Sequence, residues 1–202
     1  MEIKLTKQMA DEIMKAEGIV RGWDLKLMVD FIIKEAGMDG WEKVKKKLEK
    51  IGYPLKEDTI KRVRFSPLGL RVLIILSTVE CLKWKEEKIR EWGEYIPKKL
   101  MIIKFFSHLF RIKKDFFFKD LPRISARYLK GIEMIPIEGN VEKKYCILKI
   151  RKIKAPPIAE KIGLIFYEGF FKSWAQMILG TKELECKSEI ENDYYKFKIK
   201  WQ

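Results

Sequence analysis

The chain has 202 residues and a formal net charge of +14, from 43 basic and 29 acidic side chains. Hydrophobic residues make up 47% of it, which is enough for one folded domain and too many for a disordered tail. Charged residues such as Arg71, Lys104 and Glu168 interrupt its apolar stretches, so we expect no membrane-spanning helix. Three cysteines and a polar N-terminal segment predict a cytoplasmic protein without a disulfide framework.

The first part of the chain is predicted to be helical. Thr6, Asp24 and Asp39 each precede hydrophobic residues spaced three and four apart, and such polar residues cap helix N-termini. Glycine ends two of these segments, because it readily adopts the left-handed conformation that follows a helix. We therefore expect helices at residues 6–16, 24–37, 39–52 and 56–64.

A hydrophobic helix follows these segments. Ser66 and Pro67 are predicted to form its N-cap and first residue, and it extends to about Leu82. A helix without a polar face is normally buried, so we interpret it as part of the core. The alternative is that it also forms one wall of a cavity for an apolar ligand.

The middle of the chain combines basic charge with phenylalanine. A charged helix is expected at residues 85–95, with Ile89 and Trp92 facing inward and Pro97 breaking it. Another helix is expected at residues 98–110. Six rings gather here, at Phe105, Phe106, Phe110, Phe116, Phe117 and Phe118. They could lie on a membrane surface, but we favour packing in the core or around a pocket.

The last third predicts two hairpins and a long helix. Strands are expected at residues 132–137 and 144–151 around a turn at 138–140, and an apolar helix follows at 155–180. From residue 183 onward, hydrophobic and charged residues alternate strictly in two further strands. Opposite charges favour the register that sets Ile190 opposite Tyr195.

These elements predict an α+β fold in a single domain, residues 1–202. Residues 1–130 would be the helical part, and residues 131–202 the sheet-and-helix part that holds a ligand. The four strands would form one antiparallel sheet, with the helix at 155–180 packed on it. The abundance of lysine, glutamate and isoleucine is typical of a thermophile.

Several short motifs carry a resemblance to a known fold. They are Gly-Phe-Phe-Lys-Ser-Trp at residues 169–174, Cys186, the ending at 193–201, and upstream signals at 21–23, 65–67 and 93–97. This pattern resembles the ligand-binding fold shared by H-NOX haem sensors, 4-vinyl-reductase domains and TRAPP tethering subunits. Within that group it is most similar to an uncharacterised haem-less family first noted as myxobacterial paralogues.

The resemblance raises the question of haem. In H-NOX proteins, a helix histidine ligates the haem iron and a Tyr-x-Ser-x-Arg motif holds the propionates. His108, the only histidine, lies in a predicted helix, but the matching strand positions are Ile147, Lys149 and Arg151, so only the arginine is shared. Cys186 alone matches the paired cysteines of 4-vinyl-reductase domains. We therefore expect neither haem nor a metal, with a haem-based gas sensor as the weaker alternative.

No catalytic signature is present in the sequence. One histidine leaves room for no histidine cluster, and the chain has no glycine-rich phosphate loop. We therefore predict a non-catalytic sensing or adaptor module for a small apolar or acyl-like ligand, acting as a homodimer or through a partner protein. The predicted pocket residues are Phe105, Phe106, Phe166, Phe170, Phe171, Trp174, Phe197 and Trp201. The alternative, from the net charge, is electrostatic binding of nucleic acid or an anionic membrane.

Overall fold

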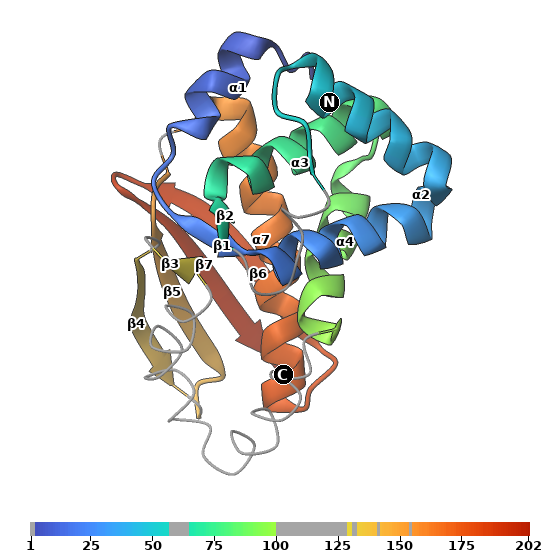
Figure 1. Cartoon of the computed structure of the whole chain (residues 1–202). Coiled ribbons are helices and arrows are strands. Elements are labelled where there is room, and N and C mark those ends of the chain that lie inside the picture. Colours follow the sequence, from blue (N-terminus) through green and yellow to red (C-terminus); the bar gives the residue numbers. More distant parts are fainter. Residues whose placement is uncertain (1–2, 57–64, 100–128, 131–132, 141, 154) are drawn as a thin grey trace. The chain divides into compact units, whose positions relative to one another are not determined.

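The computed structural model of the chain describes residues 3–56, 65–99, 129–130, 133–140, 142–153 and 155–202. These residues form a mixed α+β fold with antiparallel strands, as the sequence predicts (Figure 1). They divide into two compact units. Unit 1 comprises Met1–Ile89, Leu129–Gly131 and Ile153–Gly163, and unit 2 comprises Arg90–Tyr128, Ile132–Lys152 and Leu164–Gln202.

Unit 1 contains helices and a small sheet. Its elements are α1 (Lys7–Met14), β1 (Ile19–Arg21), α2 (Gly22–Lys50), β2 (Phe65–Pro67), α3 (Leu68–Leu82) and β3 (Leu129–Lys130). The three strands pair antiparallel in the order β2-β1-β3. The sequence did not predict this sheet, because strands of two or three residues are too short to show alternation.

The first helices agree with the prediction except at one boundary. Thr6 caps α1, since its hydroxyl accepts a hydrogen bond from the Met9 backbone. Gly37 has φ 70° and ψ −179°, so the predicted break between two helical stretches lies inside α2. However, α2 begins at Gly22, and Asp24 lies in its first turn instead of capping it.

Asp24 forms a buried ion pair with Arg71 in the first turn of α3. Nε of Arg71 lies 3.0 Å from Oδ2 of Asp24. Burial raises the pKa of Asp24, and the positive charge of Arg71 opposes that shift. The pair ties α2 to α3 at the N-terminal end of each helix.

α3 is buried along most of its length, which confirms its predicted place in the core. Its start differs from the prediction. Ser66 pairs with Val20 in the small sheet, and Pro67 occupies the N-cap position. The Leu68 N–H donates to the Gly18 carbonyl at 2.9 Å. This backbone carbonyl therefore takes the role that the side chain of a capping residue was expected to play.

Unit 2 is built on a four-stranded sheet. Its elements are α4 (Glu86–Lys99), β4 (Met134–Asn140), β5 (Tyr145–Arg151), α7 (Pro157–Leu179), β6 (Leu184–Glu191) and β7 (Tyr194–Trp201), with the first residues of α4 and α7 in unit 1. The strand order is β4-β5-β7-β6, all antiparallel (Figure 1). The predicted register of the last hairpin is confirmed from Leu184–Trp201 to Ile190–Tyr195.

Two predicted boundaries in unit 2 are wrong. β4 continues through residues 138–140, where a turn was expected, because these residues pair with β5 beyond a register shift between Pro136 and Glu138. α4 continues past Pro97 to Lys99. A proline this close to the helix end removes only the bond to the Gly93 carbonyl, so the last turn can still form.

Some predictions lie outside the described residues. They concern most of the helix at 56–64, the helix at 98–110, the phenylalanines at 105, 106, 110 and 116–118, and His108. Within the described part of the chain, no helix is long and apolar enough to cross a membrane.

Candidate functional site

Five aromatic rings pack together between α7 and the sheet, and we call them the aromatic cluster. They are Tyr167, Phe170, Phe171 and Trp174 of α7 and Phe197 of β7. The α7 members are spaced three and four residues apart, so they share one face of the helix. The Phe171 ring centroid lies 4.9 Å from that of Phe197, and the Tyr167 centroid lies 6.3 Å from it. Contacts of this kind each contribute about 0.5–1.5 kcal/mol beyond burial.

The aromatic cluster is part of a larger apolar core. Its neighbours on the sheet come from the inward-facing rows of β5 and β7, and its neighbours on α7 continue the same helix face. Phe171 and Phe197 are fully buried, whereas Tyr167 and Phe170 are half-buried at the rim. The rings therefore grade from a covered centre to an accessible edge.

The structure brings together most of the predicted pocket residues that it describes. Phe170, Phe171, Trp174 and Phe197 belong to the aromatic cluster, and Trp201 packs against the same core. Phe166 lies beside the cluster, 5.9 Å from Tyr167 and 5.7 Å from Trp92 between ring centroids. Phe105 and Phe106 lie outside the described residues. That these rings line a ligand pocket stays a prediction.

Two further aromatic residues belong to this region and were not predicted as site residues. Tyr167 stacks on Phe171, with the ring planes 20° apart. Trp92 of α4 contacts Phe166 edge to face. The spacing of Tyr167 from Phe170, Phe171 and Trp174 could have revealed it, whereas nothing in the local sequence connects Trp92 to α7.

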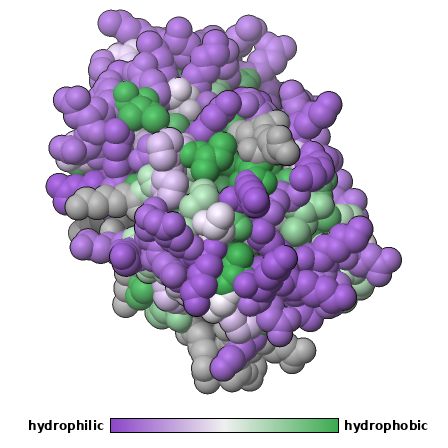
Figure 2. All heavy atoms as spheres, turned by 90° about the horizontal axis from the view of Figure 1, so that it is seen from above, coloured by the Kyte–Doolittle hydropathy of each residue, from purple (hydrophilic) through white to green (hydrophobic). Residues whose placement is uncertain are grey.

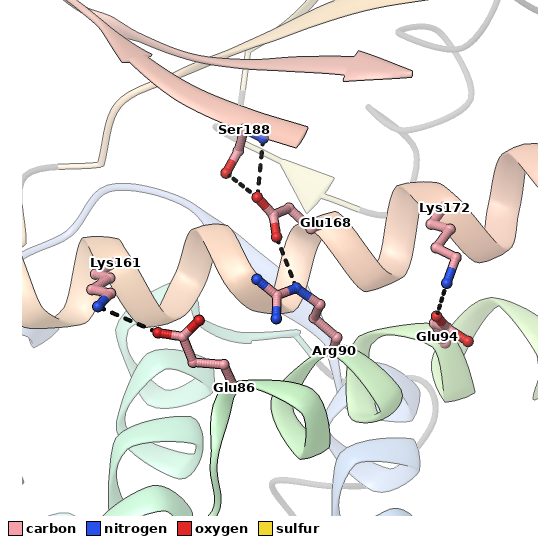
Figure 3. A network of polar contacts seen from close by, with 7 residues as sticks. All are labelled: Glu86, Arg90, Glu94, Lys161, Glu168, Lys172 and Ser188. Atoms are coloured by element: carbon pink, nitrogen blue, oxygen red, sulfur yellow. Dashed lines mark hydrogen bonds and ion pairs between the residues drawn. The ribbon is translucent and has the colours of Figure 1, made fainter. Parts of the chain in front are cut away.

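Glu168 joins α7 to both α4 and β6. Its Oε1 accepts hydrogen bonds from the Ser188 backbone N–H at 3.0 Å and the Ser188 hydroxyl at 2.7 Å. Its Oε2 lies 3.0 Å from Nε of Arg90 on α4 (Figure 3). The Glu168 side chain is only 14% exposed, so these donors replace water around the carboxylate. No local pattern in the sequence identifies this carboxylate, because its partners Ser188 and Arg90 lie 20 and 78 residues away along the chain.

Two glycines, Gly93 of α4 and Gly169 of α7, allow the backbones of these helices to come into contact beside Glu168. A Cβ atom on Gly93 would lie 2.0 Å from the Phe166 carbonyl oxygen, and one on Gly169 would lie 2.0 Å from the Arg90 carbonyl oxygen. Only glycine fits at these two positions. Lys172 and Glu94 form an ion pair at 3.0 Å near this crossing (Figure 3).

Two thiols flank Ile199 on the inner side of the sheet. Cys146 of β5 and Cys186 of β6 are its neighbours across the strands. Burial raises the pKa of Cys146 to about 12, and burial with the nearby Glu168 charge raises the pKa of Cys186. Both are therefore protonated thiols at neutral pH, which are poor nucleophiles and poor metal ligands. Among the described residues, no group of three His, Cys, Asp or Glu side chains could hold a metal ion.

The strand positions that resemble a propionate site do not fit an anion. Ile147, Lys149 and Arg151 lie on the side of β5 opposite its buried row. Lys149 pairs with Glu191 at 2.6 Å, and Arg151 pairs with Glu133 at 3.3 Å. The two cations thus already have carboxylate partners. His108 lies outside the described residues, so haem binding stays an untested alternative.

Comparison with solved structures defines the fold. An H-NOX protein from S. oneidensis in the Fe(II)NO state superposes with a TM-score of 0.54 at 14% identity, covering 90% of this chain and 99% of that one. Unliganded Fe(II) H-NOX from K. algicida gives a TM-score of 0.55 at 8% identity, covering 90% and 96%. An oxygen-binding H-NOX domain related to soluble guanylate cyclases gives 0.52 at 14%, covering 90% and 95%.

These similarities establish that the chain has the α+β fold of H-NOX proteins. Identities of 8–15% establish the fold alone. No model of a known protein family matches the sequence, and no curated protein matches it. A shared fold does not by itself establish a shared function.

Proposed function

We propose that this chain is a non-catalytic sensing module that binds a small apolar or acyl-like ligand at the aromatic cluster and signals through a protein partner. One observation carries the proposal: large rings gather between α7 and β7, graded from buried Phe171 to half-buried Phe170. The fold supports it, because the solved proteins that share it include an oxygen-binding domain and an Fe(II)NO complex.

The chemistry of the cluster favours an apolar ligand over a polar one. Its side chains are aromatic, and apolar sites with few polar groups suit hydrophobic ligands. A ligand chain that displaced the half-buried Phe170 ring would take over that ring's contacts. Burying its apolar surface would contribute roughly 25 cal/mol per Å².

The same region supports binding without catalysis. Glu168, a carboxylate on the same helix, is held by Ser188 and Arg90, and the thiols of Cys146 and Cys186 are protonated. A general base or nucleophile needs a free lone pair directed at a substrate. The Glu168 carboxylate and the two thiols are therefore poorly suited to catalysis. A movement of α7 would instead change the hydrogen bonds of Glu168 to Ser188 and Arg90.

The first test is native mass spectrometry of the purified protein, with an absorption spectrum of the same sample. A bound molecule of acyl-chain mass without a Soret band supports the proposal. A Soret band that is lost in His108→Ala would contradict it and establish haem binding. A protein with neither would be titrated with cis-parinaric acid, a fluorescent acyl probe.

Variants localise the site in that titration. Phe170→Ala should change the affinity for cis-parinaric acid by at least about fivefold, because it alters the rim of the aromatic cluster. Met38→Ala is the matched control, since Met38 is an exposed apolar side chain on α2 in the other unit. Equal effects of both substitutions, or saturable binding by neither protein, would refute the proposed site.

The electrostatic alternative has weaker support. In the densest described lysine cluster, Lys45 pairs with Glu42 at 2.9 Å and Lys47 with Glu80 at 2.6 Å. Figure 2 shows a face on which hydrophilic residues predominate; its colours give hydropathy and do not separate positive from negative charge. Binding to nucleic acid or to anionic vesicles that weakens steeply with salt would favour this alternative.

A further inference from the structure

The two edges of the four-stranded sheet are closed in different ways. Among the strands that the structure describes, β4 forms one edge and β6 the other. In β4, Pro136 has no backbone N–H, and a register shift follows it. Both features oppose the addition of another strand. β6 contains no proline and pairs with β7 without interruption, so its closure depends on side chains.

Glu168 closes the β6 edge at Ser188. The Ser188 N–H donates to Oε1 of Glu168, so it points away from β7. Backbone groups of an antiparallel strand alternate in direction, and those of Leu184 and Cys186 therefore point outward too. The bond from the Gln202 N–H to the Glu183 carbonyl agrees, since it directs an odd-numbered residue toward β7. A carbonyl of an added strand would need the place of the Glu168 carboxylate.

We propose that the β6 edge is a pairing surface for a second copy of this chain and that Glu168 is the residue that closes it. A carboxylate can rotate away from a backbone N–H, whereas a proline and a register shift are permanent. Only the β6 edge can therefore be opened without refolding. Self-pairing at the β6 edge does not require a ligand. A ligand that moved α7 would also move Glu168 and so open the edge. Only this link between ligand binding and edge opening rests on the proposed function.

The charges of β6 favour its own copy as the partner. In antiparallel pairing about Cys186, Glu185 of each copy lies opposite Lys187 of the other, which gives two favourable pairs by symmetry. Within one chain, these two exposed side chains pair with each other at 2.7 Å, and Lys187 stands opposite Lys198 of β7. A second copy would thus offer Lys187 a better neighbour than β7 does.

The same pattern limits the length of the paired segment. The next residues outward would bring Glu183 of one copy opposite Glu189 of the other, and like charges destabilise a strand pair. Pairing is therefore confined to residues 184–188. Hydrogen bonds would form between Leu184 and Ser188 of opposite copies and between the two Cys186 residues, in the phase set by the Ser188 N–H.

Sedimentation velocity over a concentration series tests the closure. Glu168→Ala should self-associate at least about tenfold more tightly than wild type, because the Ser188 N–H is uncovered. Glu168→Gln is the matched control: it also removes the charge opposite Arg90, but its amide oxygen can still accept from Ser188. It should therefore behave as wild type. Circular dichroism establishes that each variant is folded.

A second variant separates the edge from other surfaces. Ser188→Pro removes the outward N–H, and an edge strand tolerates proline where the N–H faces away from its partner. Glu168→Ala combined with Ser188→Pro should return to the wild-type association constant. Equal association of wild type and Glu168→Ala, or dimers that persist in the double variant, would overturn the proposal.

The register is tested by oxidation. With copper phenanthroline as oxidant, the two Cys186 thiols of a Glu168→Ala dimer lose two protons and two electrons and form one disulfide. The expected Cα separation, about 5.5 Å for a hydrogen-bonded pair, suits that bond. Cys186→Ser must abolish the crosslink. Crosslinking that persists, or that is equal in wild type, would contradict pairing about Cys186.

Discussion

Each unit contains an arginine Nε that lies 3.0 Å from a carboxylate oxygen, and the two pairs differ in their surroundings. In unit 1, the Arg71 and Asp24 side chains are 3% and 7% exposed. In unit 2, the Arg90 and Glu168 side chains are 40% and 14% exposed, and Ser188 shares the carboxylate. Burial makes the first pair costly to break. In the second pair the Arg90 side chain is exposed to water and Glu168 has Ser188 as a further partner, so the Arg90–Glu168 contact can break at lower cost.

The largest expected effect is in the buried pair. Arg71→Ala should lower the free energy of unfolding by about 3–5 kcal/mol, because it leaves the Asp24 charge buried without its partner. Arg90→Ala is the matched substitution and should cost about 1 kcal/mol or less, since Glu168 keeps both of its hydrogen bonds from Ser188. Urea denaturation measures both. Equal losses would show that the environment does not distinguish the two pairs.

The glycine crossing of α4 and α7 should show the next largest effect. Gly93→Ala places a Cβ where a carbonyl oxygen lies and should cost about 1–3 kcal/mol through forced separation of the helices. Gly163→Ala on α7 is its control, since nothing lies within 4 Å of the added Cβ. That substitution should leave stability equal or slightly raised, by up to about 1 kcal/mol. Thermal unfolding compares them, and a stable Gly93→Ala protein would contradict the close crossing.

Burial gives the Asp24 pair a pH dependence. The pKa of Asp24 is raised in the folded state above its ordinary 3.8, so the folded state binds this proton more tightly than the unfolded state. The stability that this proton binding contributes is fully present below pH 3.8 and is lost as the pH rises through the raised pKa of Asp24. Wild type should therefore gain stability relative to Asp24→Asn as pH falls from 7 toward 4. A difference that is constant with pH, or that shrinks, would refute the raised pKa.

The smallest effect is expected on the outer face of the sheet. Lys196 lies 2.6 Å from Glu189 and 2.6 Å from Glu191, and these carboxylates raise its pKa. Lys196→Ala should lower the melting temperature slightly at low salt and not at 1 M NaCl, because salt screens exposed charges. Glu12→Ala, an exposed carboxylate on α1, serves as the control for a general charge effect. A loss that persists at high salt would show that Lys196 acts through packing.

Regular elements could be predicted where the pattern of burial repeats along the chain. The β6–β7 register, the long α7 and the buried α3 all follow from periodicity, because each exposes one face or none to water. The aromatic spacing on α7 predicted most of the cluster for the same reason. Within that register Glu185 lies opposite Lys200, a favourable cross-strand neighbour, and it also pairs with Lys187 along its own strand.

Features that join distant segments could not be predicted. The sheet of β2, β1 and β3 joins residues near 66, 20 and 130, the Asp24 pair joins residues 47 apart, and the Glu168–Ser188 bonds link a helix to an edge strand. Each depends on one residue or a few. A single contact leaves no period in the sequence.

By itself, then, the sequence determined the α+β class, the last hairpin with its register and the apolar face of α7, since these depend on periodic burial along one element. Only the tertiary structure decided that Glu168 closes the β6 edge, that glycines allow α4 to touch α7 and that Asp24 pairs with Arg71. Those features depend on which distant atoms meet, and chain folding, not local pattern, brings them together.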